Sequence, residues 1–343
     1  MQLLTAPTVP ASAEVDWEEV ERIVFAGRVE ALVLRALPPN TPAAFRERLQ
    51  TRARKVAFSG LRALRERDQL MAALQESGVE RAVLLKGSVL GWLLYPDPLL
   101  RSMNDLDLLV SPKDMDTCRD TLCRLGYIEN DLFPKRSASR DHYHERLYYR
   151  ELVPKRVRQI VELHTGFAQD FRHDIPYSQL LERALLFPEG GPGAYRLEDT
   201  DQLIHLCVHM AREQFLGPLK HLLDIHHWVQ QDRVDWPSLI QRSAGFQTAT
   251  AVSESLRLAQ LIFQTRVPAA VVRALRPSWT RRRFLQWWHQ PRAESLLRFS
   301  VSMRTAQAVA MLPLLDTHTQ RLRCLWGYGS LRARDWWGTV RTA

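Results

Sequence analysis

Two short apolar segments, residues 82–86 and 105–110, constrain the fold more than any other feature of this sequence. Each segment has the length of a strand, and each ends at turn-forming residues, a Gly-Ser pair after the first and a Ser-Pro pair after the second. Helical periodicity follows both segments, over residues 89–95 and 115–125. We therefore expect a β-α-loop-β-α succession, with both strands buried in a small sheet.

The segments before and after this unit have a mostly helical pattern. Residues 15–78 repeat apolar side chains at intervals of three and four, interrupted by Pro38-Pro39, and residues from 199 onward show the same spacing. Between them, residues 141–152 and 158–164 alternate in polarity and predict a hairpin. The pattern as a whole is typical of an α+β fold with a small mixed sheet.

A glycine-rich cluster at residues 190–193 is the one linker-like stretch in the chain. It predicts a boundary between a strand-bearing middle part and a helical C-terminal part. We expect three units: an N-terminal helical segment (1–78), an α/β core (79–190) and a helical C-terminal domain that closes a cleft (194–343).

Composition excludes several classes of protein. The apolar runs are far shorter than the ~18 residues that a membrane span requires, and the N-terminal residues lack the pattern of a secretory signal. The cysteines show neither CxxC pairing nor spacing to histidines that would suit a metal, so we expect reduced thiols in a cytoplasmic protein. These are Cys118, Cys123, Cys207 and Cys324.

The carboxylates of Asp105 and Asp107 predict a metal site. Side chains alternate along a strand, so these two lie on one face while Leu106 and Leu108 point the other way. Paired anions on an apolar strand repel each other unless a cation joins them, and Mg²⁺ or Mn²⁺ prefers such oxygen ligands. A third carboxylate, Glu162, lies on the later strand and either completes the metal site or acts as a general base.

The first strand leads into a turn that suits a phosphate group. Gly87 and Ser88 begin a helix whose free N–H groups and dipole attract anions. Lys86 before the turn and Arg101 before the second strand are the expected cationic ligands of a triphosphate. The GxxxxGK[ST] pattern is absent, which argues against a P-loop enzyme.

These motifs resemble a bacterial family of uncharacterised nucleotidyltransferases within the polymerase-β-like superfamily. The resemblance extends from about residue 15 to residue 267 and is most specific in the KG…Y…R…DxD combination. The segments that carry it are LLKGSVLGWLLYPDPLLRSMNDLDLLV (84–110), VELH (161–164), DQLIHLCVHMAREQ (201–214) and LKHLLDIHHWV (219–229).

The resemblance implies a polymerase-β-like core and a role for each matching residue. It places nucleotide binding at Gly87 and Ser88, metal ligation at Asp105 and Asp107, and a third acid at Glu162. The loop from Ser88 to Asp105 is longer than in the commoner polymerase-β-like pattern.

We expect the reaction to transfer a nucleoside monophosphate from an NTP, with ATP as the expected donor, to an acceptor, with release of pyrophosphate. A hydroxyl on a small molecule or a peptide is the first acceptor hypothesis. The second is a tRNA or other RNA end, and the third is a non-catalytic nucleotide-binding protein. Intact Asp105, Asp107 and Glu162 argue against the third.

Histidines and a basic tail add two further hypotheses. His205 and His209 have a spacing that zinc sites use, but no third ligand is evident, so we expect His209, like His164, to line the substrate site. Beyond residue 265 the chain carries 14 arginines, no lysine and three acids, with six of the ten tryptophans. This surface suits RNA, although we favour tryptophans that pack inside the domain.

Overall fold

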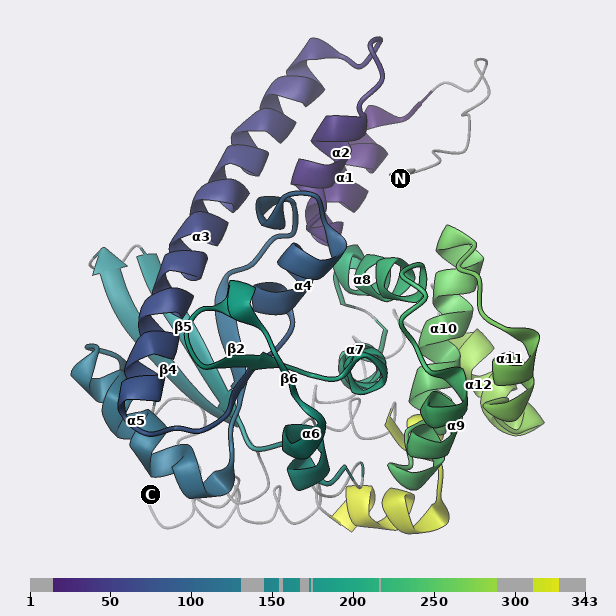
Figure 1. Ribbon diagram of the computed structural model, residues 1–343. Coiled ribbons are helices and arrows are strands. Elements are labelled where there is room, and N and C mark those ends of the chain that lie inside the picture. The colour runs from purple at the N-terminus through teal and green to yellow at the C-terminus, as the bar shows by residue number, and fades with distance from the viewer. Residues whose placement is uncertain are drawn as a thin grey trace, which may run out of the picture.

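The computed structural model describes residues 15–130, 145–153, 157–166, 173, 175–215, 217–288 and 311–326. A mixed β-sheet lies at the centre, and helices cover both of its faces (Figure 1). Most of the other described residues are helical, which agrees with the expected α+β class.

Within the described residues the sheet has seven strands in the order β3-β4-β5-β2-β1-β7-β6. β2 pairs with β5, and β1 with β7, in parallel, whereas the other neighbours are antiparallel. The strands are β1 (Ala82–Leu84), β2 (Asp105–Leu109), β3 (Ile128–Glu129), β4 (Glu145–Val153), β5 (Val157–His164), β6 (Leu185–Leu186) and β7 (Ala194–Arg196).

The alternation of β2 separates an apolar face of the sheet from the face that bears the acids. Leu106 and Leu108 are fully buried among side chains of α3 (Ala43–Glu76) and α5 (Met115–Arg124). Leu109 points the opposite way and packs with Leu180 of α6 (Tyr177–Arg183). Asp107 shares the face of Leu109 because the two residues are two positions apart on the strand.

The N-terminal segment contains more helices than its hydrophobic periodicity suggests. α1 (Trp17–Gly27) ends where Arg28 adopts a left-handed conformation and its N–H group bonds the last turn, and α2 (Glu30–Ala36) follows. α3 then runs beside the sheet as one long helix that ends in the turn before β1 (Figure 1).

The glycine cluster at residues 190–193 forms a turn inside the sheet, which differs from the linker that we expected. β6 and β7 are antiparallel strands on either side of it, and β7 pairs in parallel with β1. Flexible composition can serve a tight hairpin as well as a linker, and here the next strand is needed to extend the sheet beyond β1. The expected boundary at residues 190–194 therefore falls within the sheet.

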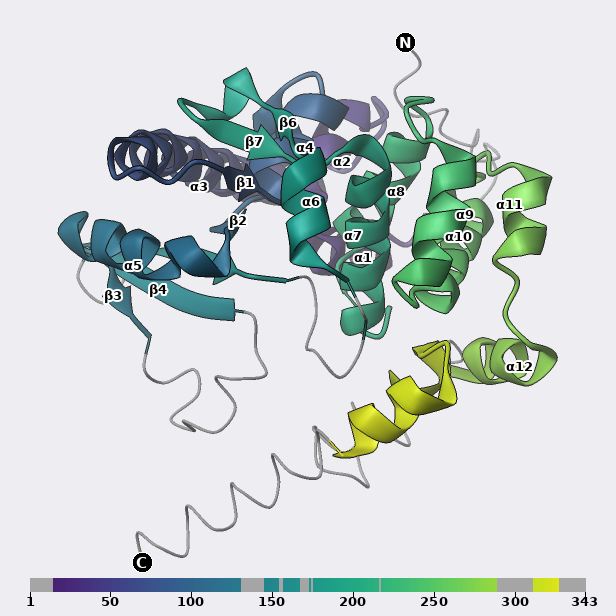
Figure 2. The same ribbon diagram turned by 60° about the horizontal axis from the view of Figure 1, so that its bottom comes forward.

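The C-terminal helices form a second apolar core beside the sheet. Figure 2 shows α7, α8 and α10 packed side by side, and Trp228, Leu203 and Val252 are fully buried among them. No helix of the described residues is long and apolar enough to cross a membrane. The helices are α7 (Asp199–Arg212), α8 (Leu219–Val229), α9 (Trp236–Gly245), α10 (Ala249–Phe263), α11 (Ala269–Ala274) and α12 (Trp279–Trp288).

The expectation that the C-terminal tryptophans pack inside the domain is wrong for those whose side chains the structure describes. Trp279 and Trp287 of α12 are 64% and 42% exposed, and Trp326 is 79% exposed. α12 instead turns Leu285 inward, where it packs with Met311, and Leu285 is the buried apolar side chain among the described ones of this short helix.

A buried ion pair joins the sheet to the C-terminal helices. Arg101 follows the short 3₁₀ helix η1 (Pro98–Leu100) and donates from Nε and NH2 to the Asp224 carboxylate on α8, the NH2 bond measuring 2.8 Å. Tyr95, just after α4 (Gly87–Leu94), donates its hydroxyl to the same carboxylate at 2.8 Å. Both charged side chains are almost completely buried. Removing one partner of such a pair leaves the other charge buried without an opposite charge.

We expect Arg101→Met to lower the free energy of unfolding by about 3–5 kcal/mol, because Asp224 would remain buried and unpaired. The double variant Arg101→Met/Asp224→Asn should recover much of that loss, since no charge is then left. Urea denaturation measures both. Arg119→Met, which removes an exposed surface pair with Asp116, serves as the control and should cost no more than about 1 kcal/mol. An Arg101 variant as mild as this control would contradict the prediction.

Candidate active site

The acidic residues of the sheet meet because β2 and β5 run parallel and in register. Asp107 lies opposite Glu162, and Leu109 lies opposite His164. On the far side of β5, the antiparallel strand β4 places Glu145 opposite His164. The two acids of the central strand pair and the histidine therefore share one face of the sheet.

Asp107 is the centre of this cluster. Its side chain is 2% exposed, and its Oδ1 accepts a hydrogen bond from Lys86 Nζ at 2.5 Å. His164 Nε2 lies 3.1 Å from the same oxygen and 3.6 Å from Glu162 Oε2. A carboxylate buried to this degree needs such partners, because removing an ion from water costs several kcal/mol.

The cluster shifts the pKa values of its members in different directions. Burial would raise the pKa of Asp107, but Lys86 and His164 hold it well below its usual range. Burial, together with the negative charges of Asp107 and Glu145, raises the pKa of Glu162. Asp107 thus remains an anion, whereas Glu162 holds a proton more readily. In such an arrangement one carboxylate can stabilise positive charge while the other accepts or donates a proton.

The two cations of the cluster are stabilised in their charged forms. Burial would lower the pKa of His164, but its bonds to Asp107 and Glu162 raise it to about 9. Burial opposes the charge of Lys86 as well, yet Asp107 and Glu162 raise its pKa above the ordinary value. Asp107 is therefore neutralised by the protein's own cations.

The chemistry of the donors fits a divalent cation. Asp107, Glu162 and His164 each offer a ligand atom, and these atoms lie within 4.8 Å of one another. The carboxylates of Asp107 and Glu162 can bind Mg²⁺ or Mn²⁺ together with water, and His164 can add a ligand only after it loses its proton. Because Lys86 Nζ bonds to the Asp107 oxygen, this ammonium and a metal ion are competitors for one site.

Two residues of the cluster do not follow from the sequence patterns. Glu145 of β4 is a further half-buried acid of the cluster, and Arg212 at the end of α7 pairs with its Oε2 at 3.2 Å. Burial would raise the pKa of Glu145, but Arg212 holds it below its ordinary value. The hairpin register could have identified Glu145 as the partner of His164, had the length of the turn between the strands been known.

Asp105 lies apart from the other predicted acids. It begins β2 and is half-buried, and it does not belong to the described group of ligand atoms formed by Asp107, Glu162 and His164. Its charge acts instead on Lys220, whose pKa is lowered to about 7 by burial and by Arg101, with Asp105 opposing this shift.

Packing and backbone conformation explain part of the residue choice at the turn of Gly87 and Ser88. Lys86 precedes α4 with φ 46° and ψ −120°, a backbone conformation that L-residues rarely adopt. A Cβ atom on Gly87 would lie 2.7 Å from NH1 of Arg101, so only glycine permits this approach. Ser88 is buried and donates its Oγ–H to the carbonyl of Leu85 at 2.8 Å. The glycine and the arginine of the motif are thus coupled sterically.

Arg101 has different surroundings from those that we expected, and His209 belongs to a group of side chains at the end of α7. Arg101 directs its guanidinium at Asp224, an acid far away in the sequence, and not into the cluster around Asp107. His209 lies on α7 beside Glu213 and His221, and its ring centroid is 6.5 Å from that of His205. Burial, followed by the charge of Lys86, holds the pKa of His209 well below its usual value.

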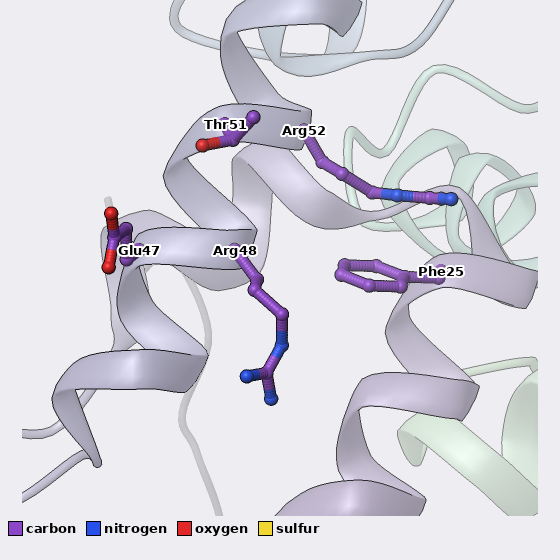
Figure 3. A pocket seen from close by; sticks show the side chains of 5 residues that line it. All are labelled: Phe25, Glu47, Arg48, Thr51 and Arg52. Carbon is purple, nitrogen blue, oxygen red and sulfur yellow. The ribbon is translucent and has the colours of Figure 1, made fainter.

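A shallow hollow of about 320 Å³ between α1 and α3 lies apart from these acids. Figure 3 shows Arg52 extended over the ring of Phe25, with its guanidinium carbon 4.2 Å from the ring centroid. The arginines of this hollow are neutralised, Arg48 by Glu21 and Arg52 by Glu30. The hollow therefore lacks an uncompensated charge that would attract a nucleotide.

The sheet thus carries paired carboxylates on neighbouring strands, with a lysine at the strand-to-helix turn beside them. Residues 13–264 match the model of a family described as "Uncharacterised nucleotidyltransferase", and the chain belongs to this family. The general activity is accordingly nucleotidyl transfer, with an NTP as one substrate. Comparisons with curated proteins and with solved structures gave no match.

The strained backbone of Lys86 leads to a stability prediction. We expect Lys86→Gly to be more stable than Lys86→Ala by about 1 kcal/mol, because glycine adopts positive φ without the clash of a Cβ atom. Both variants lose the same ion pair with Asp107, so the difference isolates the backbone. Chemical denaturation of the two proteins measures it. Equal stabilities would show that the backbone at this residue is unstrained.

The raised pKa of His164 predicts how its contribution to stability depends on pH. The folded pKa is about 9, and the unfolded pKa is about 6.5, so the contribution is complete below pH ~6.5 and is lost as the pH rises to ~9. The difference in unfolding free energy between wild type and His164→Gln should shrink by up to about 3 kcal/mol over this interval.

This difference is to be measured in the presence of a chelator, with wild type and variant at each pH. The lowered pKa of Lys220 acts in the opposite direction over part of the same interval, but it is common to both proteins and cancels in the difference. A difference that stays constant from pH 6 to pH ~9.5 would contradict the predicted protonation of His164.

Proposed function

We propose that the chain is a metal-dependent nucleotidyltransferase of the polymerase-β-like type. It transfers a nucleoside monophosphate from an NTP, with ATP as the expected donor, to a hydroxyl group on a small molecule or a peptide. The observation that carries the proposal is the buried Asp107 carboxylate, which bonds to Lys86 at the turn before α4 and lies beside Glu162 on the neighbouring strand. The cysteine pattern of the sequence, with neither CxxC pairing nor metal-type spacing to histidines, supports a cytoplasmic location.

Asp107 would be the main ligand of the divalent cation, either Mg²⁺ or Mn²⁺, with Glu162 beside it on the neighbouring strand. When bound, the cation would neutralise charge on the triphosphate and polarise the phosphorus centre that is attacked. Lys86 would bind a phosphate oxygen through Nζ, and the N–H groups of Gly87 and Ser88 at the start of α4 would add dipolar stabilisation. These residues act by position and charge.

Glu162 is the proposed general base. Its raised pKa brings it closer to neutrality, where a carboxylate accepts a proton most effectively. The acceptor hydroxyl loses its proton to Glu162 as its oxygen bonds to the α-phosphorus, and the bond from that phosphorus to the β-phosphate oxygen breaks. Pyrophosphate leaves with the bonding electron pair. His164 positions both carboxylates through its contacts with Asp107 and Glu162.

The C-terminal arginines bear on the choice of acceptor. Arg281 donates to the backbone oxygen of Asp316 and to Thr250, so one arginine of the Arg281–Arg283 cluster is used inside the protein. Arg283 lies over the exposed ring of Trp279, with 5.5 Å between the guanidinium carbon and the ring centroid. This usage favours a small-molecule or peptide acceptor, and an RNA end is the alternative.

The acceptor class is tested by transfer of label. The protein is incubated with each α-³²P-labelled NTP, Mg²⁺ or Mn²⁺, and separated fractions of small molecules, peptides and RNA. We expect label in the small-molecule or peptide fraction, with a mass increase of one nucleoside monophosphate. Label confined to the RNA fraction would establish the alternative acceptor. Absence of transfer and of pyrophosphate release with every NTP and fraction would refute the enzymatic proposal.

Two variants separate the roles of the acids. Asp107→Asn should abolish pyrophosphate release, because it removes the charge that the cation needs. Glu162→Gln should lower kcat by about 10²–10⁴-fold while the Kd of the nucleotide changes little, as expected for a general base. Glu151→Gln, on the exposed face of β4 in a pair with Arg158, is the matched control and should retain full activity.

Full activity of Asp107→Asn would contradict the metal assignment. A large loss of nucleotide affinity with unchanged kcat in Glu162→Gln would make this residue a binding ligand and not the base.

A further inference from the structure

A second group of metal-type ligands lies on the C-terminal helices, at the junction of α7 and α8 (Figure 1). Glu213 directly follows α7, and its carboxylate stands between two imidazoles. His221 Nδ1 lies 3.0 Å from Glu213 Oε2, and His209 Nε2 lies 3.5 Å from Glu213 Oε1. The three ligand atoms lie within 4.8 Å of one another.

This group is mostly shielded from solvent. The side chains of His209 and His221 are each 11% exposed, and that of Glu213 is 32% exposed. The two imidazole rings are 4.8 Å apart between centroids, in an edge-on arrangement. The ring nitrogens that approach the carboxylate come from two different helices, so tertiary packing and not helical spacing alone forms the group.

The position of Gly217 supplies a second, independent observation about this group. A Cβ atom on Gly217 would lie 1.8 Å from Glu213 Oε2 and 3.3 Å from His221 Nδ1. Any other residue at this position would displace the carboxylate from between the histidines. The absence of a side chain at Gly217 therefore leaves room for the carboxylate of Glu213.

We propose that His209, Glu213 and His221 form a binding site for a transition-metal ion of the zinc class, separate from the carboxylate site at Asp107. Two imidazoles and one carboxylate are the protein ligands of open zinc sites, which keep a further position for water or substrate. Imidazole ligands favour Zn²⁺ and Co²⁺ over Mg²⁺, which prefers oxygen ligands. The two sites thus differ in the metal that they select.

The proposed metal site lies near the acids of the sheet in the sequence of contacts. Arg212, which lies between His209 and Glu213 in the sequence, pairs with Glu145 at 3.2 Å. An ion at the second site would therefore lie on the helix end that contacts the carboxylate cluster. Binding of the ion itself does not depend on the proposed nucleotidyl transfer.

Cobalt is the probe for the site. The full-length protein is freed of metal with a chelator and titrated with Co²⁺, and visible absorption reports the ligand field. We expect one equivalent of Co²⁺ to give an intense band typical of four or five ligands including nitrogen, and Zn²⁺ to displace it. Zn²⁺ should also raise the Tm, because it binds the folded state.

Variants locate the ion. His221→Gln and Glu213→Gln should weaken Zn²⁺ binding by more than about 100-fold, beyond the loss typical of supporting residues, and should abolish the band and the Tm shift. Asp107→Asn should leave both intact. His226→Gln, a change elsewhere on α8, is the matched control and should bind normally. Circular dichroism without metal verifies that each variant is folded.

Gly217→Ala keeps all three ligands and tests the space for the carboxylate, so it decides the question if a histidine variant fails to fold. We expect it to lose most of its Zn²⁺ affinity. Absence of stoichiometric binding in wild type would overturn the proposal and leave a hydrogen-bonded cluster. A band that disappears in Asp107→Asn and persists in His221→Gln would place the metal at the carboxylate site alone.

Discussion

The ion pair between Lys86 and Asp107 is the interaction on which the rest of the site depends. Both side chains are withdrawn from water, so neither charge is tolerable without the other. The lysine reaches the carboxylate only because the chain turns sharply from β1 into α4, in a backbone conformation that costs on the order of 1–3 kcal/mol for an L-residue. Glycine would avoid that cost but would leave Asp107 without its ammonium partner. The strain is thus tied to the electrostatics of the centre.

Much of the sheet could be predicted from local patterns. The two short apolar runs, the helices after them and the hairpin all occur where the periodicity indicates them. The alternation of β2 also correctly assigns Asp105 and Asp107 to one face, opposite Leu106 and Leu108. These features follow from the spacing of side chains along a single strand, which the sequence contains directly.

Partners distant in the sequence could not be predicted in this way. Arg101 was expected to bind phosphate. No pattern in the neighbouring sequence indicates that its guanidinium group pairs with Asp224 on α8. Glu145 and Arg212 were missed for the same reason, since they meet only when β4 and α7 are assembled around β5. The glycine-rich turn was misjudged because its composition suits a linker and a hairpin equally, and only the pairing of β7 with β1 distinguishes them.

The buried pair of Arg101 and Asp224 has a consequence for how the chain divides. It crosses from the loop before β2 to α8, and Tyr95 joins it from the end of α4. A fragment that stopped after the sheet would lack both the acid that pairs with Arg101 and the helix that covers it. We therefore expect the sheet and the helices of the second core to fold together, and during synthesis the loop before β2 would acquire its final environment only after α8 has been made.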